Sequence, residues 1–181
     1  MDMQEVPVKQ TTVYDGHIIK VRLDEARLPD GTTAPREVVE HPGGVGIALE
    51  GEDGKFFFVT QYRYGQEAVM LEYPAGKKEA GEDPMTTAKR EIIEETGYEG
   101  EDFVHLGSLV PTPAYDTEVI ELYYARQGKF VGQHLDADEN INLSRLSLDE
   151  IIDKIVAGEV SDAKTVAMSF LIREFKARGR I

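Results

Sequence analysis

The sequence predicts an α/β (α+β) fold: a mixed sheet with helices on both sides, preceded by N-terminal antiparallel strands. Residues 11–40 alternate between apolar and polar side chains, as strands with one covered face do. Further strand-like runs follow as far as residue 146, interrupted by one helical segment at about residues 84–96. Two segments with apolar residues at helical spacing, 148–157 and 162–177, close the chain. A chain of 181 residues is long enough for one well-buried core, so we expect a single main domain.

The N-terminal segment is predicted to form an antiparallel meander. Turn signals at residues 15–16 and 29–31 separate short alternating runs. The predicted strands cover residues 12–14, 18–23, 26–28 and 37–41. Pro42 and the glycines after it break the last of these strands. We therefore expect an N-terminal strand appendage at residues 1–43 and a main domain at residues 44–181.

The main domain opens with a strong hairpin signal, because Asp53 and Gly54 lie between two apolar runs. A later run leads into residues 74–76, which we interpret as a tight turn, and a turn-rich loop lies at residues 111–116. The predicted strands are residues 45–49, 56–61, 69–73, 104–110, 118–125 and 141–146. Ser147 then provides a capping signal for the helix that follows it.

The helix at residues 84–96 has clear signals at both ends. Asp83 can accept hydrogen bonds from the free N–H groups of the first turn, and Pro84 suits the first helical position. Gly97 can adopt the left-handed conformation that often ends a helix. These signals set which side chains share a face of the helix.

Three carboxylates crowd the last two turns of this helix, where ordinary helix physics would avoid them. Glu91 shares a face with Glu94 and Glu95, because residues three and four apart are neighbours on a helix. All three lie toward the negative end of the helix dipole. Each effect is unfavourable by about 0.2–1 kcal/mol, and a bound cation would reverse both. Hard divalent ions such as Mg²⁺ take oxygen ligands, so this face predicts a metal site, which Arg90 would brace.

The composition excludes several classes of protein. Hydrophobic residues make up 41% of the chain and charged residues 30%, which is ordinary for a globular protein. No apolar run approaches the roughly 18 residues of a membrane-spanning helix, so we expect a cytoplasmic protein without a membrane partner. The net charge of −14 would repel the phosphates of nucleic acid. The absence of cysteine excludes disulfides and thiolate chemistry.

The carboxylate helix lies within a longer motif. The residues of this motif are Gly76, Glu82, Arg90, Glu91, Ile92, Glu94, Glu95, Gly97 and Tyr98. At this spacing they resemble the signature of the Nudix hydrolases. Tyr98 alone departs from it, being aromatic where the family usually has an aliphatic residue. The resemblance implies an α/β/α sandwich and an enzyme that splits diphosphate links with the help of divalent ions.

Segments outside the motif resemble one branch of that family, the ADP-ribose pyrophosphatases or nucleoside diphosphate sugar hydrolases. The matching parts are residues 36–43, Pro113 and residues 162–165. Ala114 departs from the branch, which usually has glycine after that proline. Tyr115 also resembles a marker of Nudix enzymes that split dinucleoside polyphosphates.

The resemblance implies metal-binding roles for residues of this chain. Glu91 and Glu95 would be the principal ligands of Mg²⁺, or of Mn²⁺ as a substitute. Glu94 would assist, the carbonyl oxygen of Ala75 would contribute, and Glu82 would orient the ligands.

The same branch takes one acidic residue from a loop after the last sheet region, as a general base or as a further metal ligand. In this chain the loop is at residues 135–140, where Glu139 matches best and Asp138 is the reserve choice. The implied catalytic residues are therefore Arg90, Glu94 and Glu139.

Four residues are predicted to bind the substrate. Arg36 and Arg63 could hold phosphate oxygens, because a guanidinium offers paired hydrogen-bond donors. Tyr115, like Tyr14, could stack on a base, although an aromatic residue on a strand more often belongs to the core. Glu72 completes the predicted set.

The favoured function is Mg-dependent hydrolysis of the diphosphate bond of nucleoside diphosphate sugars, such as ADP-ribose or GDP-mannose. The products would be a nucleoside monophosphate and a sugar phosphate. A hydrolase of dinucleoside polyphosphates or nucleotides is the nearest rival. A Nudix fold used as a ligand sensor is disfavoured, because binding alone needs no full carboxylate set. The resembled branch and the apolar faces of the N-terminal strands further imply a homodimer with strands exchanged between subunits.

Overall fold

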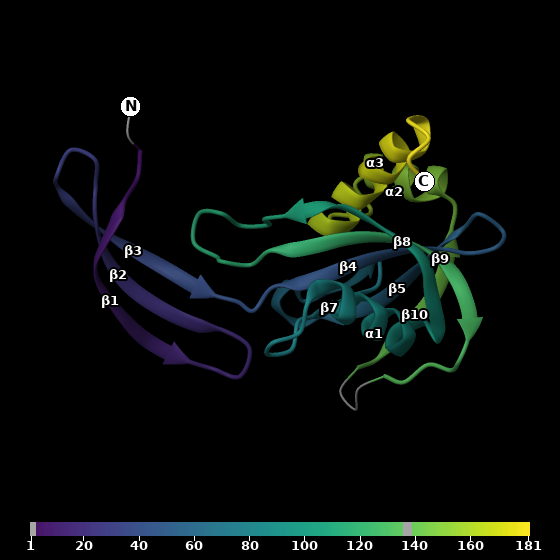
Figure 1. Ribbon diagram of the computed structural model, residues 1–181, viewed down its shortest axis with the longest axis horizontal. Helices are drawn as coiled ribbons and strands as arrows, with labels where there is room; N and C mark the ends of the chain where they lie inside the picture. The colour runs from purple at the N-terminus through teal and green to yellow at the C-terminus, as the bar shows by residue number, and fades with distance from the viewer. Residues whose placement is uncertain (1–2, 136–138) are drawn as a thin grey trace. The chain divides into compact units, whose positions relative to one another are not determined.

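The computed structural model describes residues 3–135 and 139–181 and contains two compact units (Figure 1). The first unit comprises Met1–Gly43 and Val110–Val119. The second unit comprises Gly44–Leu109 and Ile120–Ile181. The loop at residues 110–119 therefore groups with the N-terminal strands rather than with the elements that flank it in sequence.

The first unit is a three-stranded antiparallel sheet in the order β1-β2-β3. Its strands are β1 (Val6–Asp15), β2 (Lys20–Arg27) and β3 (Thr33–Glu40). Two sequence-based predictions were wrong here. The first strand begins well before residue 12, and the separate strands at residues 18–23 and 26–28 are one strand. The polar pair Asp24 and Glu25 continues the ladder against β3, because a strand without a buried face tolerates polar residues at either position.

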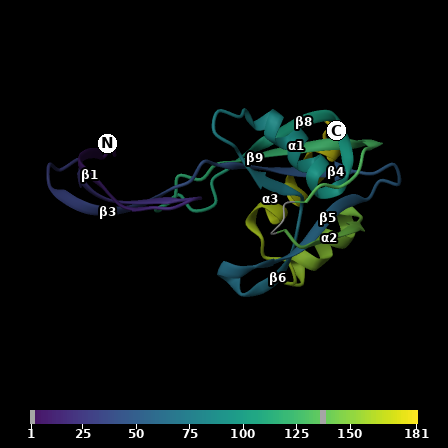
Figure 2. The same ribbon diagram turned by 90° about the horizontal axis from the view of Figure 1, so that it is seen from below.

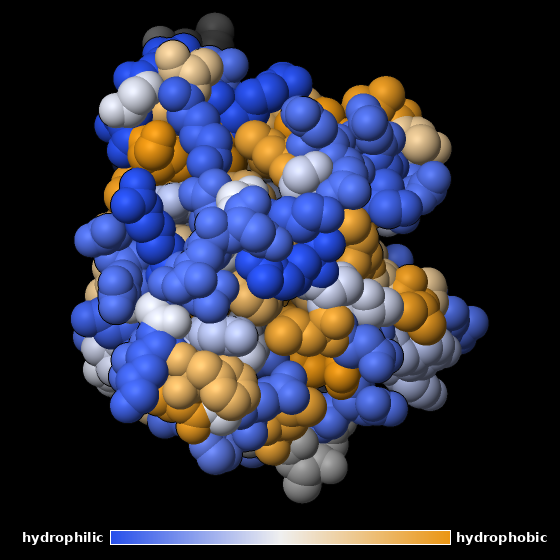
Figure 3. Space-filling model, turned by 90° about the vertical axis from the view of Figure 1, so that its right-hand side faces the viewer, coloured by the Kyte–Doolittle hydropathy of each residue, from blue (hydrophilic) through white to orange (hydrophobic). Residues whose placement is uncertain are grey.

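This small sheet has almost no core of its own. Ala26 is the one buried residue of β1, β2 and β3, and every residue of β1 is exposed. The exposed large apolar side chains of the segment include Val6, Val8, Val13, Tyr14, Ile18 and Leu23. The face drawn in Figure 3 is mostly hydrophilic, with hydrophobic patches among the hydrophilic residues. The sheet therefore exposes several large apolar side chains and buries almost none.

The second unit contains a mixed sheet, as predicted, and this sheet has seven strands. Its main path runs β10-β5-β4-β9-β8, with β6 paired to β5 and β7 paired to β4. The β4–β9 pair is parallel and the remaining pairs are antiparallel. The strands are β4 (Gly44–Glu50), β5 (Phe56–Arg63), β6 (Ala68–Glu72), β7 (Ala75–Lys77), β8 (Tyr98–Leu109), β9 (Ile120–Phe130) and β10 (Ile141–Leu146), and a 3-10 turn at Tyr64–Gln66 joins β5 to β6.

Helices cover both faces of this sheet, which confirms the predicted α/β/α sandwich (Figures 1 and 2). α1 (Pro84–Thr96) lies on one face, and α2 (Leu148–Val156) and α3 (Ala163–Ala177) lie on the other. The strands explain how both faces become apolar, because successive side chains of a strand point to opposite sides. In β5, Phe56 and Phe58 join the core beneath α2 and α3, whereas Phe57 joins the core beneath α1.

The strand predictions for this unit were correct in place but not always in length. β8 and β9 extend well beyond residues 104–110 and 118–125, and residues 75–77 form the short strand β7 instead of part of a tight turn. The outer ends of β8 and β9 contain polar residues, so an interpretation based on hydrophobic runs did not include them. Within residues 3–135 and 139–181, no helix is long and apolar enough to cross a membrane.

Candidate active site

The site is built on α1, whose two ends are fixed as its sequence predicts. The Asp83 carboxylate accepts hydrogen bonds from the backbone N–H groups of Met85 at 3.0 Å and Thr86 at 3.1 Å. Gly97 ends the helix with φ of 78°, in the left-handed region that favours glycine. These caps set the register of the helix and hence the face on which its glutamates lie.

Glu91 and Glu95 are buried, with only 8% and 2% of their surface exposed. Burial raises the pKa of the Glu91 carboxyl to about 7, although the nearby Arg90 opposes the rise. Burial also raises the pKa of Glu95 to about 8, although the N–H of Ala75 opposes it. The negative charge of Glu91 adds to the rise in the pKa of Glu95, and the charge of Glu94 adds to the rise in the pKa of Glu91. Two buried carboxylates whose pKa values are raised despite these contacts are suited to receive a cation.

Arg90 is the main positive group on this face of the helix. Its Nη1 lies 2.9 Å from Glu91 Oε1 and 2.8 Å from Glu94 Oε2. Its Nη2 donates to the carbonyl oxygen of Lys77 at 3.2 Å. Arg90 therefore contacts the carboxylates of Glu91 and Glu94, as the sequence predicted.

Glu82 holds Arg90 from the other side. Its two carboxylate oxygens accept from Arg90 Nε at 3.3 Å and Nη2 at 3.1 Å. The hydroxyl of Thr87 and the N–H of Glu79 also donate to Glu82. The hydrogen bonds from Arg90 lower the pKa of Glu82 to about 2, with the bonds from Thr87 and Glu79 adding to the effect. Glu82 therefore stays ionised and orients Arg90.

The β7 segment passes directly against these carboxylates. The N–H of Ala75 donates to Glu95 Oε2 at 3.0 Å. A Cβ atom on Gly76 would overlap the carboxylate of Glu91, so only glycine allows this approach. Pairing with β4 holds the segment in place, since Ala75 is opposite Gly46 and Gly76 is opposite Val45.

Glu139 comes close to the same cluster from the loop before β10. Its charge contributes to the raised pKa values of both Glu91 and Glu95, after the larger effect of burial. Glu139, which was chosen from the sequence, therefore lies near these carboxylates. The reserve choice, Asp138, lies outside the described residues.

Arg63 and Glu72 form a pair at the edge of this cluster. Arg63 Nε donates to Glu72 Oε1 at 2.7 Å, and Nη2 donates to Oε2 at 2.6 Å. The positive charge of Arg63 lowers the pKa of Glu95, against the larger effect of burial, so the guanidinium lies within electrostatic reach of Glu95. Glu72 is itself buried and also pairs with Lys164.

The other two predicted substrate residues belong to the first unit. Arg36 lies on β3, where its Nη2 pairs with Glu5 Oε1 at 2.6 Å. Tyr115 is 54% exposed and its backbone oxygen accepts from the N–H of Val39 at 2.7 Å. Tyr14 is likewise exposed, so neither tyrosine is a core residue. The structure therefore gathers Arg63, Glu72, Ala75, Arg90 and the glutamates in the second unit, but not Arg36 or Tyr115.

The carboxylate and carbonyl oxygens of this site suit a hard divalent ion, although they are not gathered around one position. In the part of the chain that the structure describes, no three His, Asp or Glu side chains are gathered as a ready metal site. Glu91 and Glu94 instead pair with Arg90, and Glu95 accepts from Ala75. An ion bound here would replace Arg90 as a partner of the carboxylates of Glu91 and Glu94.

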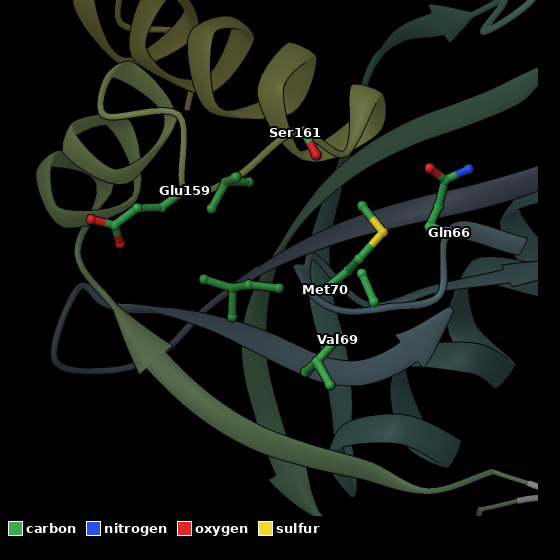
Figure 4. A pocket seen from close by; sticks show the side chains of 8 residues that line it. Gln66, Val69, Met70, Glu159 and Ser161 are labelled. Carbon is green, nitrogen blue, oxygen red and sulfur yellow. The ribbon is translucent and has the colours of Figure 1, made fainter. Parts of the chain in front are cut away.

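A cavity of about 260 Å³ lies elsewhere in the second unit, between β6 and the connection from α2 to α3 (Figure 4). Its lining residues are Gln66, Ala68, Val69, Met70, Leu71, Glu159, Val160 and Ser161. None of the glutamates of α1 lines it. We therefore assign the chemistry to the α1 face and not to this cavity.

Comparison with protein-family models identifies the family of this chain. The model of the NUDIX domain matches residues 40–167. The chain belongs to the Nudix family. A second model, the nucleoside diphosphate sugar hydrolase N-terminal domain, matches residues 7–39 of this Nudix protein.

Two known relatives align with most of this Nudix chain. A methanol dehydrogenase activator of Bacillus methanolicus is 40% identical over 165 residues, covering 90% of this chain and 89% of that protein. An ADP-ribose pyrophosphatase of Bacillus subtilis (strain 168) is 31% identical over 165 residues, with the same 90% and 89% coverage. The crystal structure of an ADP compounds hydrolase has a TM-score of 0.85, covers 100% of both chains and is 22% identical, which supports the fold. The protein is a Nudix pyrophosphohydrolase, an enzyme class that uses divalent metal ions.

Sequence reasoning missed the contact between α3 and Glu72 of β6. Lys164 and Asp162 were noted only as a match to a C-terminal helix, yet Lys164 pairs with both Glu72 and Asp162. One signal could have found this pairing. A lysine in the first turn of a helix opposes the helix dipole, just as glutamates in the last turn do, and so points to a buried anionic partner.

Proposed function

We propose that this Nudix enzyme hydrolyses the diphosphate bond of nucleoside diphosphate sugars, ADP-ribose or a related compound such as GDP-mannose, with Mg²⁺ as its ion and Mn²⁺ as a substitute. The products are a nucleoside monophosphate and a sugar phosphate. The observation that carries the proposal is the buried pair Glu91 and Glu95, flanked by Glu94, Glu139 and Arg63. The Bacillus subtilis relative named ADP-ribose pyrophosphatase supports the substrate class.

In this proposal the divalent ion would be held by Glu91, Glu94, Glu95 and the carbonyl oxygen of Ala75. When bound, such an ion neutralises charge on the diphosphate and makes a water molecule a better nucleophile at neutral pH. Arg90 and Glu82 keep the glutamates of α1 in position through the contacts described above.

The remaining residues act on the water and the substrate. Glu139 acts on the attacking water, either by taking its proton or by completing the ligand set. A P–O bond of the diphosphate bridge breaks as the bond from water to phosphorus forms, which yields two phosphomonoesters. Arg63, with Glu72 behind it, holds a phosphate group of the substrate.

Substrate choice can be tested with one panel. Purified protein with Mg²⁺ would be incubated with ADP-ribose, GDP-mannose, UDP-glucose, ADP-glucose and diadenosine polyphosphates, and the products would be separated. We expect the largest kcat/KM for a nucleoside diphosphate sugar. A preference for diadenosine polyphosphates would favour the rival to which Tyr115 points, and binding without turnover would favour a sensor.

Binding of the ion should be visible without catalysis. We expect millimolar Mg²⁺ to raise the Tm of the protein, because an ion that binds only the native state at 100 times its Kd adds about 2.7 kcal/mol to stability. The same ion should leave the Tm of Glu95→Gln nearly unchanged. An unchanged Tm for the wild-type protein with both Mg²⁺ and Mn²⁺, and full activity in EDTA, would contradict the assignment.

We also propose a homodimer in which the strand appendage, residues 1–43, reaches the partner subunit. The exposed apolar side chains of β1 and β2 support this, because such a sheet has no core of its own to bury them. Arg36, on the appendage, would then reach phosphate in the substrate pocket of the partner subunit.

Light scattering should accordingly give twice the chain mass of 20.2 kDa at micromolar concentration. We expect Val13→Lys, which places a charge among the exposed apolar side chains of β1, to shift the protein toward monomer and to lower its activity. Val156→Lys, at a valine exposed on α2, is the matched control and should remain dimeric. A fully active wild-type monomer would exclude a pocket shared between subunits.

A second candidate function is activation of a methanol dehydrogenase. It is favoured by one observation, the 40% identity to the Bacillus methanolicus protein of that name. Adding the purified chain to a methanol dehydrogenase and measuring its rate would test the idea, and Glu95→Gln would show whether the same site is required.

A further inference from the structure

A buried ionic network joins α3 to the β5–β6 hairpin. Glu72 is 1% exposed and Lys164 is 7% exposed. Lys164 Nζ contacts Glu72 Oε2 and lies 3.0 Å from Asp162 Oδ1. Glu72 in turn accepts from Arg63 through both of its oxygens. The chain of contacts thus runs from the N-terminus of α3, through a buried carboxylate, to a guanidinium near Glu95.

Stability alone explains this network poorly. Buried ion pairs are often no better than apolar residues of the same volume, because the charges lose their hydration. Lys164 also lies in the first turn of α3, where the helix dipole disfavours a positive charge. Met168 and Ile172 on the same helix show that α3 packs through apolar contacts as well. The network therefore calls for a role beyond holding the helix in place.

The geometry restrains Arg63 in two ways. Both oxygens of Glu72 are engaged, so the guanidinium is bound through Nε and Nη2 in the paired arrangement that fixes its plane. Glu72 cannot turn away, because Lys164 holds Oε2 from the opposite side. Among the described residues, the hydrogen bonds of Arg63 use Nε and Nη2, and its side chain is 41% exposed, so a ligand can reach it.

The segment that follows Glu72 is held by the same turn of α3. The N–H of Tyr73 donates to the hydroxyl of Thr165 at 3.1 Å. Thr165 is bound in turn to Asp162, through its N–H at 2.9 Å and its hydroxyl at 2.6 Å. The start of α3 therefore fixes the side chain of Glu72 and the backbone that leads on to Ala75.

We propose that Lys164 is a positioning residue for the substrate: it fixes Glu72, and Glu72 holds the guanidinium of Arg63 ready for a phosphate group. The inference rests on the proposed function, since it concerns how the same site grips a diphosphate. Without Lys164, Glu72 and Arg63 can still pair, but the pair is free to rotate, and binding must then order it. Lys164 itself does not touch the substrate.

A double-mutant cycle tests this dependence. ADP binding, measured by calorimetry without turnover, would be compared in wild-type protein, Lys164→Met, Arg63→Met and the double variant. We expect each single change to weaken binding by about tenfold and the double variant to be no weaker than Arg63→Met, because coupled residues are not additive. With a cleavable substrate, Lys164→Met should raise KM about tenfold and change kcat less than about threefold.

Lys176→Met is the matched control, because Lys176 lies on the same helix and pairs with Glu50 at 2.7 Å. It should leave ADP binding and KM unchanged. If Lys164→Met does not fold, Asp162→Asn removes one anionic partner of Lys164 and keeps a side-chain acceptor for the cap of α3. We expect it to weaken ADP binding in the same direction by a smaller factor.

A second readout does not depend on activity. In ¹⁵N NMR spectra the Nε–H of Arg63 should be protected from exchange in the wild-type protein and in Lys176→Met, but not in Lys164→Met. Unchanged protection in Lys164→Met, or additive losses in the cycle, would overturn the proposal. If the wild-type protein hydrolyses no diphosphate, the proposed function fails, whereas the NMR comparison still decides whether Lys164 positions Arg63.

Discussion

Replacing Glu95 with glutamine is expected to lower kcat by about a thousandfold or more and to raise the Tm of the metal-free protein. The loss follows from removing a buried carboxylate from the proposed metal site, where an amide is a poorer ligand for a hard ion. The gain in Tm has a separate cause. Glu95 is 2% exposed and near the charges of Glu91 and Glu139, so its ionised form is disfavoured in the folded protein.

A glutamine keeps the shape of the side chain and an oxygen that can accept from the N–H of Ala75. Relief of about 1 kcal/mol would raise Tm by about 2–4 °C in a chain of this length. Glu99→Gln is the control, because Glu99 is exposed on β8 and should change neither quantity. Near wild-type turnover in Glu95→Gln at saturating metal would show that α1 does not carry the metal site.

The position of the carboxylate cluster could be predicted because it conflicts with helix physics. Glutamates at the negative end of a helix, crowded on one face, are unfavourable without a cation, so the sequence itself signals the site. Arg90 and Glu82 followed from the same motif, and each contacts the other in the structure. Lys164 gave a comparable signal at the start of α3, but its partner Glu72 is distant in sequence. The neighbours of a residue within one helix can therefore be predicted from the sequence spacing, whereas a contact between a helix and a strand distant in sequence cannot.

The fold shows the same division between local and long-range information. The ends of α1 were predictable from Asp83 and Gly97, because capping depends on neighbouring residues. The lengths of β8 and β9 were not, because they pair with each other beyond the buried core, where polar side chains suit a strand. Gly76 was interpreted as part of a turn, but the structure shows that a glycine is needed there because Glu91 approaches closely. The segment that contains it pairs with β4 as the strand β7.

Replacing Glu139 with glutamine is expected to lower kcat by about a hundredfold or more and to leave KM within about threefold of its wild-type value. A group that takes a proton from water, or that holds the water, acts in the transition state rather than on the bound substrate. The proximity of Glu139 to Glu91 and Glu95, seen in its effect on their pKa values, is the structural support. The measurement is steady-state kinetics on the preferred substrate with saturating Mg²⁺.

Two comparisons make this result specific to Glu139. Asp138→Asn, a change in the same acidic loop, should lower kcat far less if the choice of Glu139 is correct. Binding of Mg²⁺ followed by Tm separates the two proposed roles, because a lost ligand weakens the response to the ion and a lost base does not. A large rise in KM with unchanged kcat would instead make Glu139 a substrate contact, and small equal effects from both variants would reduce the loop to a solvated turn.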